Sequence, residues 1–422
     1  MSLQFLVIMV PVVLGFMGFA VDLGRMYLVR AELNQAASAI ALSAAAQLNG
    51  TSGALDTATA AGQVTLDNSL QDGNKFNFGS LVVGQGSALL TSTVQSPSFF
   101  AALADAMAAF GTTGGSTADG TTARHVLVNL NADAPLTFWG LLSLGQSRKA
   151  SIAAAAIAGV SAPVCTACGI EPFAIAAVDT SDPNDFGLVN GQIYTFAFDC
   201  TNNVTLLAGS TAPALKYLLL DRYDTGSTFA EDQQLFRVGA QGLIPSASTP
   251  GFACSTIGGT EAVWSANSSV IAVAACRATG AAVDTRVTDA VCGLSSRMAD
   301  PTQITACQNI TDVGTVASAY TGDTDLTPAI TDYTSYAGNN TRVMTVPIVA
   351  ALATDGSMTV LGFRQFLLEP TPNVTPVAND PTDAGGRFTA MYIGVVKPVK
   401  QGSISAPSCS ISSGPGKVVL HQ

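Results

Sequence analysis

Residues 3–48 read LQFLVIMVPVVLGFMGFAVDLGRMYLVRAELNQAASAIALSAAAQL and contain the strongest structural signal in the chain. Its first part, Leu3–Val21, carries no charge, and Gln4 is its only strongly polar side chain. At about 1.5 Å of rise per residue, a helix over this run spans roughly the 30 Å hydrocarbon core of a bilayer. The run therefore predicts a membrane-spanning helix.

The helical pattern continues beyond the apolar run, where the charged residues begin with Asp22. Apolar residues recur there at steps of three and four, which places them on one face of a helix: Met26, Val29, Leu33, Ala37, Ile40, Ala44 and Leu48. One helix from Leu3 to Leu48 would be about 70 Å long, which is longer than an anchor needs. Pro11 is expected to kink it, because proline lacks the amide hydrogen and crowds the preceding turn.

Two alternatives compete with a membrane helix. A cleaved secretory signal has a basic start, a shorter apolar core and a small-residue cleavage site. This chain has no basic start, and its helical pattern runs well past the apolar core. The core helix of a soluble protein fits less well, because the run offers no polar face to water.

Small residues leave parts of this helix without bulk and predict a surface where helices approach closely. The predicted assembly surface contains Pro11, Gly15, Gly18, Ala20 and Gly24. A homo-oligomer formed through N-terminal helices follows from this interpretation. The alternative is that these are ordinary glycines of a membrane helix with no partner.

The run from Gly18 to Arg25 reads GFAVDLGR, a G-x-A-V-D-x-G-R pattern at the end of an apolar helix, and an alanine-rich helix follows it. Over about fifty residues this segment resembles the N-terminus of tight-adherence (Tad) pilus-assembly proteins of the TadE/TadG-like group. Ala123–Gly159 and the segments from Val343 to the C-terminus are similar to the same group. The resemblance implies a single-pass, pilin-like protein of the bacterial envelope with other pilus components as partners. Mature type IV pilins often have glutamate at the fifth position, where this chain has Phe5.

Composition favours an extracellular structural protein. Only 11% of the 422 residues are charged, and the formal net charge is −11. A nucleic-acid partner would require a basic surface, so nucleic acid is not expected as a ligand. Such a low charge density is typical of a surface built from Ser, Thr, Asn and Gly.

The eight cysteines all follow residue 160: Cys165, Cys168, Cys200, Cys254, Cys276, Cys292, Cys307 and Cys409. An even number in loop-rich sequence predicts a disulfide framework, which persists in an oxidising compartment. Arg25 and Arg30 point the other way, since the positive-inside rule would place them in the cytoplasm. We give the cysteines more weight, which predicts an extracytoplasmic domain behind an inner-membrane anchor.

The predicted fold class is α+β, in three parts. Residues 1–50 form the apolar helix, residues 51–160 form a small pilin-like α+β headpiece, and residues 161–422 form a mostly β region with disulfides. In the headpiece, helices are expected at Ala54–Leu70 and Pro97–Phe110, with strands at Phe76–Val83, Ala88–Val94, His125–Leu130 and Ala150–Ile157. A helical turn is expected around Pro135–Leu144.

In the third part the strands expected are Phe173–Val178, Gln192–Phe198, Tyr217–Leu220, Arg342–Val349, Met358–Leu368, Phe388–Val396 and Lys417–His421. A helix is expected at Ala230–Val238. Residues 250–340 offer little continuous apolar pattern, so we interpret them as a loop-rich insertion held by disulfides.

Few residues suggest chemistry. Cys165 and Cys168 form a C-x-x-C motif, but Gly169 stands where haem attachment needs a histidine, and no second C-x-x-C completes a zinc site. Structural disulfides are the favoured interpretation. No G-x-S-x-G nucleophile motif and no Walker loop occur, so no catalytic residue, cofactor or enzymatic activity is predicted.

The acidic loops Asp179–Asp185 and Asp323–Asp325 are rich in oxygen ligands and could hold structural Ca²⁺. Plain turns are the favoured alternative, because Asp and Asn stabilise turns through local hydrogen bonds.

The sequence therefore predicts a structural, pilin-like filament subunit that the apolar helix anchors in the membrane before assembly. The alternative is a membrane-anchored accessory protein of Tad pilus assembly or cell-surface adhesion that does not polymerise. A membrane-tethered hydrolase has no nucleophile–base motif to support it.

Overall fold

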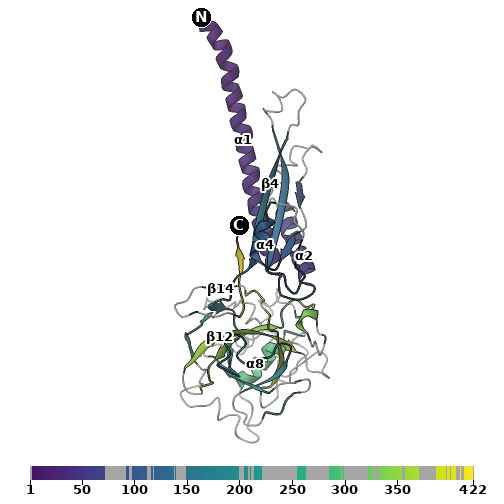
Figure 1. Cartoon of the computed structure of the whole chain (residues 1–422), viewed down its shortest axis with the longest axis vertical. Helices are drawn as coiled ribbons and strands as arrows, with labels where there is room; N and C mark the ends of the chain where they lie inside the picture. The colour runs from purple at the N-terminus through teal and green to yellow at the C-terminus, as the bar shows by residue number, and fades with distance from the viewer. Residues whose placement is uncertain are drawn as a thin grey trace. The chain divides into compact units, whose positions relative to one another are not determined.

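The computed structural model describes residues 2–71, 92–94, 97–111, 116, 118–136, 138, 149–198, 204–207, 210, 213–220, 254–262, 285–295, 297–298, 322–325, 327, 332–353, 357–369, 386–395, 397–399, 401–404, 409 and 413–421. The chain divides into two compact units. The first contains residues 1–48, 53–160 and 418–422, and the second contains residues 49–52 and 161–417. The second unit is therefore inserted into the sequence of the first at two places, as the short segment 49–52 and the long segment 161–417 (Figure 1).

The first unit is built on helix α1 (Ser2–Ala45), which continues through Pro11. Its C-terminal half has a buried stripe at three- and four-residue steps, formed by Val29, Leu33, Ala36, Ala37, Ile40, Ala41 and Ala44. Helix α2 (Ala54–Gln71) packs beside it, where a Cβ on Gly62 would lie 3.2 Å from Ile40. The small residues of these helices thus allow close helix packing.

The sheet of the first unit is centred on a long antiparallel ladder between β3 (His125–Pro135) and β4 (Lys149–Val160). β15 (Val418–Leu420) pairs with the end of β4, while β1 (Ser92–Val94) and β2 (Ser98–Phe100) pair with β3. Helix α4 (Leu103–Ala108) buries Ala106 in a cluster with Phe100, Leu127 and Ile157.

The second unit contains a closed ring of six strands: β6 (Phe173–Ala176), β8 (Leu215–Leu219), β7 (Ile193–Phe198), β13 (Phe388–Tyr392), β12 (Ser357–Glu369) and β11 (Val343–Val349). The pairs β7–β8 and β11–β6 are parallel, and the other four are antiparallel. β10 (Thr260–Ala262) adds to β12 outside the ring. Closure leaves these strands without free edges except at β10.

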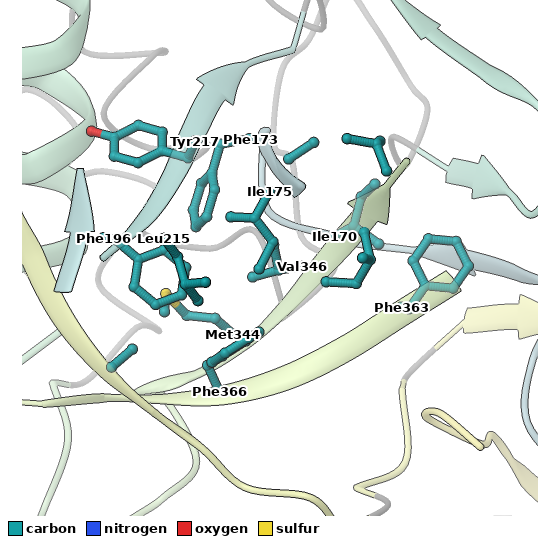
Figure 2. Close-up of a cluster of buried hydrophobic side chains, with 14 of the residues drawn as sticks. Ile170, Phe173, Ile175, Phe196, Leu215, Tyr217, Met344, Val346, Phe363 and Phe366 are labelled. Atoms are coloured by element: carbon teal, nitrogen blue, oxygen red, sulfur yellow. The ribbon is translucent and has the colours of Figure 1, made fainter. Parts of the chain in front are cut away.

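Aromatic and aliphatic side chains fill this ring (Figure 2). The Phe196 and Phe388 rings stack with centroids 4.8 Å apart, and Phe173 meets Phe388 edge to face at 5.7 Å. The buried Tyr217 donates its hydroxyl hydrogen to the carbonyl of Gly386 at 2.8 Å. Helix α8 (Thr285–Ser295) contributes Ala290 and Leu294 to the same core.

A three-stranded sheet completes the second unit, with β5 (Thr166–Cys168) between β14 (Gln401–Ser403) and β9 (Cys254–Thr256). A 3₁₀ turn, η5 (Tyr333–Ser335), begins with Asp332, whose side chain accepts a hydrogen bond from the amide of Thr334.

The α+β class and the long apolar helix are confirmed. Residues 97–110 differ from the single helix expected, because Ser98–Phe100 pairs with β3 before α4 begins. The short elements β5, β9, β10, β14 and α8 are additional to those predicted. β15 belongs to the first unit rather than to the 161–422 region, because Val418–Leu420 pairs with β4.

Several sequence predictions lie outside the described residues, wholly or largely. They are the strand at 76–83, the turn around 135–144, the helix at 230–238 and most of the strand at 88–94.

Candidate membrane and assembly site

The two halves of α1 have opposite surroundings within the first unit. The residues from Val29 onward contribute the buried stripe, whereas the first half exposes large apolar side chains. Phe16 is 72% exposed, Met17 62% and Tyr27 66%. The first half extends beyond the sheet of this unit (Figure 1). Among the described residues, α1 is the one helix that is long and apolar enough to cross a bilayer.

The small residues of the predicted assembly surface do not share one environment. No atom lies within 4 Å of the position that a Cβ would take on Gly15 or Gly24. Pro11 and Ala20 are exposed as well. At Gly18, by contrast, a Cβ would lie 2.5 Å from the Phe138 ring, so this glycine makes room for a side chain of its own chain. Gly18 is thus a packing residue of the first unit.

Asp22, the first charged residue after the apolar run, is 4% exposed. One of its carboxylate oxygens accepts a hydrogen bond from the backbone N–H of Phe138 at 3.0 Å. A cavity of about 280 Å³ lies beside it, lined mainly by apolar residues that include Phe19, Met26 and Phe138. The sequence pattern marked Asp22 as part of a motif, but Phe138 is 116 residues away, so local sequence could not reveal this contact.

Disulfides hold the second unit. Cys165 is bonded to Cys409 and Cys168 to Cys254, across 244 and 86 residues of sequence. The two cysteines of the C-x-x-C motif are therefore not bonded to each other, and neither is a free thiol. Cys292 is also disulfide-bonded. Cys200, Cys276 and Cys307 lie outside the described residues.

The helix and its motif agree with a comparison to protein families. Residues 2–47 match the family model described as "Putative Flp pilus-assembly TadE/G-like". The chain carries a TadE/G-like domain at its N-terminus. No curated protein and no solved structure gives a significant match. The TadE/G-like match and the apolar helix support a membrane-associated, pilus-related role.

Outside the TadE/G-like domain, the carboxylates of the acidic loops accept hydrogen bonds from nearby residues of the same chain. Asp179 accepts hydrogen bonds from the amide and hydroxyl of Ser181, and Asp182 accepts from the amides of Asn184 and Gly187. Asp323 accepts from the amide of Asp325 at 2.8 Å. These are the local bonds of turns. No group of three or more Asp, Glu, His or Cys side chains suited to a metal ion occurs in the part of the chain that the structure describes.

The second unit also buries charge. Arg297 and Glu171 form an ion pair at 2.8 Å with both side chains inaccessible to solvent. Arg342 lies 5.4 Å from the centre of the Tyr336 ring and is fully buried. Among the described residues, its guanidinium nitrogens and both carboxylate oxygens of Glu369 have no hydrogen-bond partner. The pKa of Glu369 is raised to about 7, chiefly by burial; Arg342 opposes this rise and Asp325 adds to it.

The only two histidines of the chain meet in the first unit. The rings of His125 and His421 lie with centroids 5.3 Å apart, in an edge-to-face arrangement. The pKa of His125 is lowered to about 4, chiefly by burial and also by the neighbouring His421 and Arg124. His125 is therefore neutral at pH 7, packed inside the sheet where β15 joins β4.

Proposed function

We propose that this chain is a structural, pilin-like subunit of a bacterial extracellular filament and that it assembles through α1. The observation that carries the proposal is the contrast within one helix. The half from Val29 onward is buried in its own unit, while the half from Val7 to Leu28 exposes large apolar side chains that a folded monomer in water could not leave uncovered.

The bilayer covers this exposed half before assembly, and neighbouring copies or other pilus components cover it in the filament. Exposed side chains such as Phe16, Met17 and Phe19 would then leave lipid for protein. At about 25 cal/mol per Å² of apolar surface kept from water, packing this helix against others is a large driving force once the helix has left the bilayer.

The disulfides support an extracellular place for the second unit, because such bonds persist in oxidising compartments. In this proposal the second unit forms the surface of the filament that meets other cells or neighbouring subunits. The role is structural, with no catalytic residue and no cofactor.

Electron microscopy of sheared cell-surface material, with mass spectrometry of the same fraction, tests the proposal. We expect filaments that contain this chain with α1 at their axis. Recovery of the chain only from membranes, without filaments, would instead establish the second candidate function: an anchored accessory protein that uses the same helix without polymerising. The matched family is described by pilus assembly, and this description fits an accessory protein as well as a filament subunit.

A further inference from the structure

Strand β4 has one edge that is largely unpaired. Along its whole length β4 pairs with β3, but on its other edge β15 pairs only with residues 158–160. The amide of His421 extends this contact by one bond to the carbonyl of Ile157 at 2.8 Å. From Lys149 to Ala156, no described strand lies on this edge.

The hydrogen bonds show which backbone groups face the open edge. The amide of Val160 bonds to the carbonyl of Arg124, on the β3 side, whereas Ile157 bonds toward β15. Because backbone groups alternate in direction along a strand, the even-numbered residues of β4 face β3 and the odd-numbered ones face the open edge. The N–H and C=O groups of Ser151, Ala153 and Ala155 therefore point outward. All three residues are at least partly exposed, and the described residues supply no partner for these groups.

A cavity of about 330 Å³ lies over the β3–β4 ladder beside this segment, and Asn129, Leu130 and Asn131 of β3 contribute to its lining. Ala153 and Ala155 line it, together with Arg30 and Asn34 of α1 and the Phe110 ring. Arg30 is the only charged residue among those lining it. Arg30 and Asn34 are one helical turn apart, so both side chains lie on the same face of α1.

We propose that the open edge of β4 binds an extended peptide segment of another protein, which adds a strand to the sheet and places an acidic side chain near Arg30. Main-chain bonds to Ser151, Ala153 and Ala155 would supply the affinity, as in other cases of strand addition. Arg30 would supply the preference for a carboxylate, and Phe110 an apolar contact. This inference does not depend on assembly through α1.

The sequence of β4 is suited to this role. Strands that must not pair with another chain usually carry charges, proline or bulges at the edge. The exposed residues of the open segment are Lys149, Ser151 and Ala153, and the ladder with β3 has no register shift. Its one charged residue, Lys149, is bonded to Asp133 at the far end. Apart from Lys149, the described open segment therefore carries none of the features that discourage pairing with a second strand.

Fluorescence anisotropy with the full chain in detergent micelles tests the proposal. The probes are two labelled eight-residue peptides of alternating threonine and valine, identical except for a central glutamate or lysine. We expect the glutamate peptide to bind about tenfold more tightly than the lysine peptide. Ala153→Pro should weaken its binding by about tenfold, because proline removes an outward-pointing N–H.

Ala153→Ser is the matched control, because it keeps the N–H and should bind within about twofold of the unmodified chain. Ala153→Pro should retain the fold, since proline is tolerated at strand edges. If it does not, Arg30→Glu on the exposed helix surface still tests the proposal, because it should abolish the preference for glutamate. Failure of both peptides to bind, or equal binding by the proline and serine variants, would overturn it. Self-association that depends on Ala153 without peptide binding would also overturn it, by showing that the occupant is a second copy.

Discussion

At the scale of single residues, the second unit keeps an acidic group where water does not reach it. Glu369 ends β12 with 2% of its surface exposed, close enough to Arg342 and Asp325 for both to affect its pKa. A buried carboxylate without hydrogen bonds is costly in its charged form. The protonation state of this side chain therefore links the stability of the second unit to pH.

Glu369→Gln should stabilise the protein at pH 8 by about 1–3 kcal/mol and have little effect at pH 4.5. The pKa of Glu369 is raised from an ordinary 4.5 to about 7, so the folded chain holds a proton that the unfolded chain releases. Its contribution to stability is complete below pH 4.5 and is lost as the pH rises through 7. Urea unfolding at the two pH values measures the effect. An equal effect at both would contradict a titrating Glu369.

His125→Gln should reduce the loss of folding stability that occurs as the pH falls below 6.5. Because the pKa of His125 is lowered from 6.5 to about 4, the unfolded chain binds a proton before the folded chain does. The stability from neutral His125 is complete above pH 6.5 and is lost as the pH falls through 4, by at most about 1.4 kcal/mol per pH unit. Thermal unfolding between pH 7 and pH 4 tests this, with the exposed His421→Gln as the control that should keep most of the slope.

At the scale of elements, α1 was predictable almost to the residue, because its signals are local. The uncharged run and the spacing from Met26 to Leu48 gave a helix to Leu48, and the helix ends at Ala45. The partner of Gly18 was not predictable, since Phe138 follows a strand far along the chain. Ser98–Phe100 was expected in a helix for a similar reason: pairing with β3 overrides its local preference.

Gly15→Leu and Gly24→Leu should reduce incorporation of the chain into filaments while leaving its fold intact. Neither glycine has a neighbour within 4 Å of a new Cβ, so leucine fits the monomer but would block close approach of another helix. The amount of chain in sheared material, relative to membranes, measures the effect. Val12→Leu at an exposed position of the same helix is the matched control and should assemble normally. Normal assembly of both glycine variants would remove these residues from the interface.

At the scale of the whole molecule, the sequence predicted that the second unit is rich in strands, but it did not predict that these strands close into a ring. Alternating and apolar runs predicted strands such as Phe388–Val396, which the structure has as Phe388–Tyr392. The ring closes because β12 pairs with both β11 and β13. These pairings depend on contacts between segments far apart in sequence. The cysteine count likewise predicted disulfides but not their partners, since eight cysteines allow 105 pairings.

Cys165→Ser with Cys409→Ser should lower the stability of the second unit by about 2–5 kcal/mol, because the bond closes a long loop of the unfolded chain. Thermal unfolding with and without reductant measures the loss. Phe196→Ala, in the buried aromatic cluster, is the comparison: it should cost about 3–5 kcal/mol both with and without reductant. Peptide mapping should recover a peptide in which Cys165 is joined to Cys409. A peptide that joins Cys165 to Cys168 would contradict this pairing.

The long segment of the second unit, residues 161–417, begins and ends at neighbouring points. Ser161 and Lys417 exchange two hydrogen bonds, at 2.8 and 3.0 Å, next to the pairing of Val160 with Val418. Residues 161–417 could therefore be exchanged as one segment, provided that the contacts of residues 49–52, such as the hydrogen bonds to Thr334 and Asn340, are replaced with them. A foreign domain whose termini lie close together could be spliced in at this junction, with β4 and β15 left to pair as before. Proteins that share this N-terminal helix and sheet could in this way carry very different outer domains.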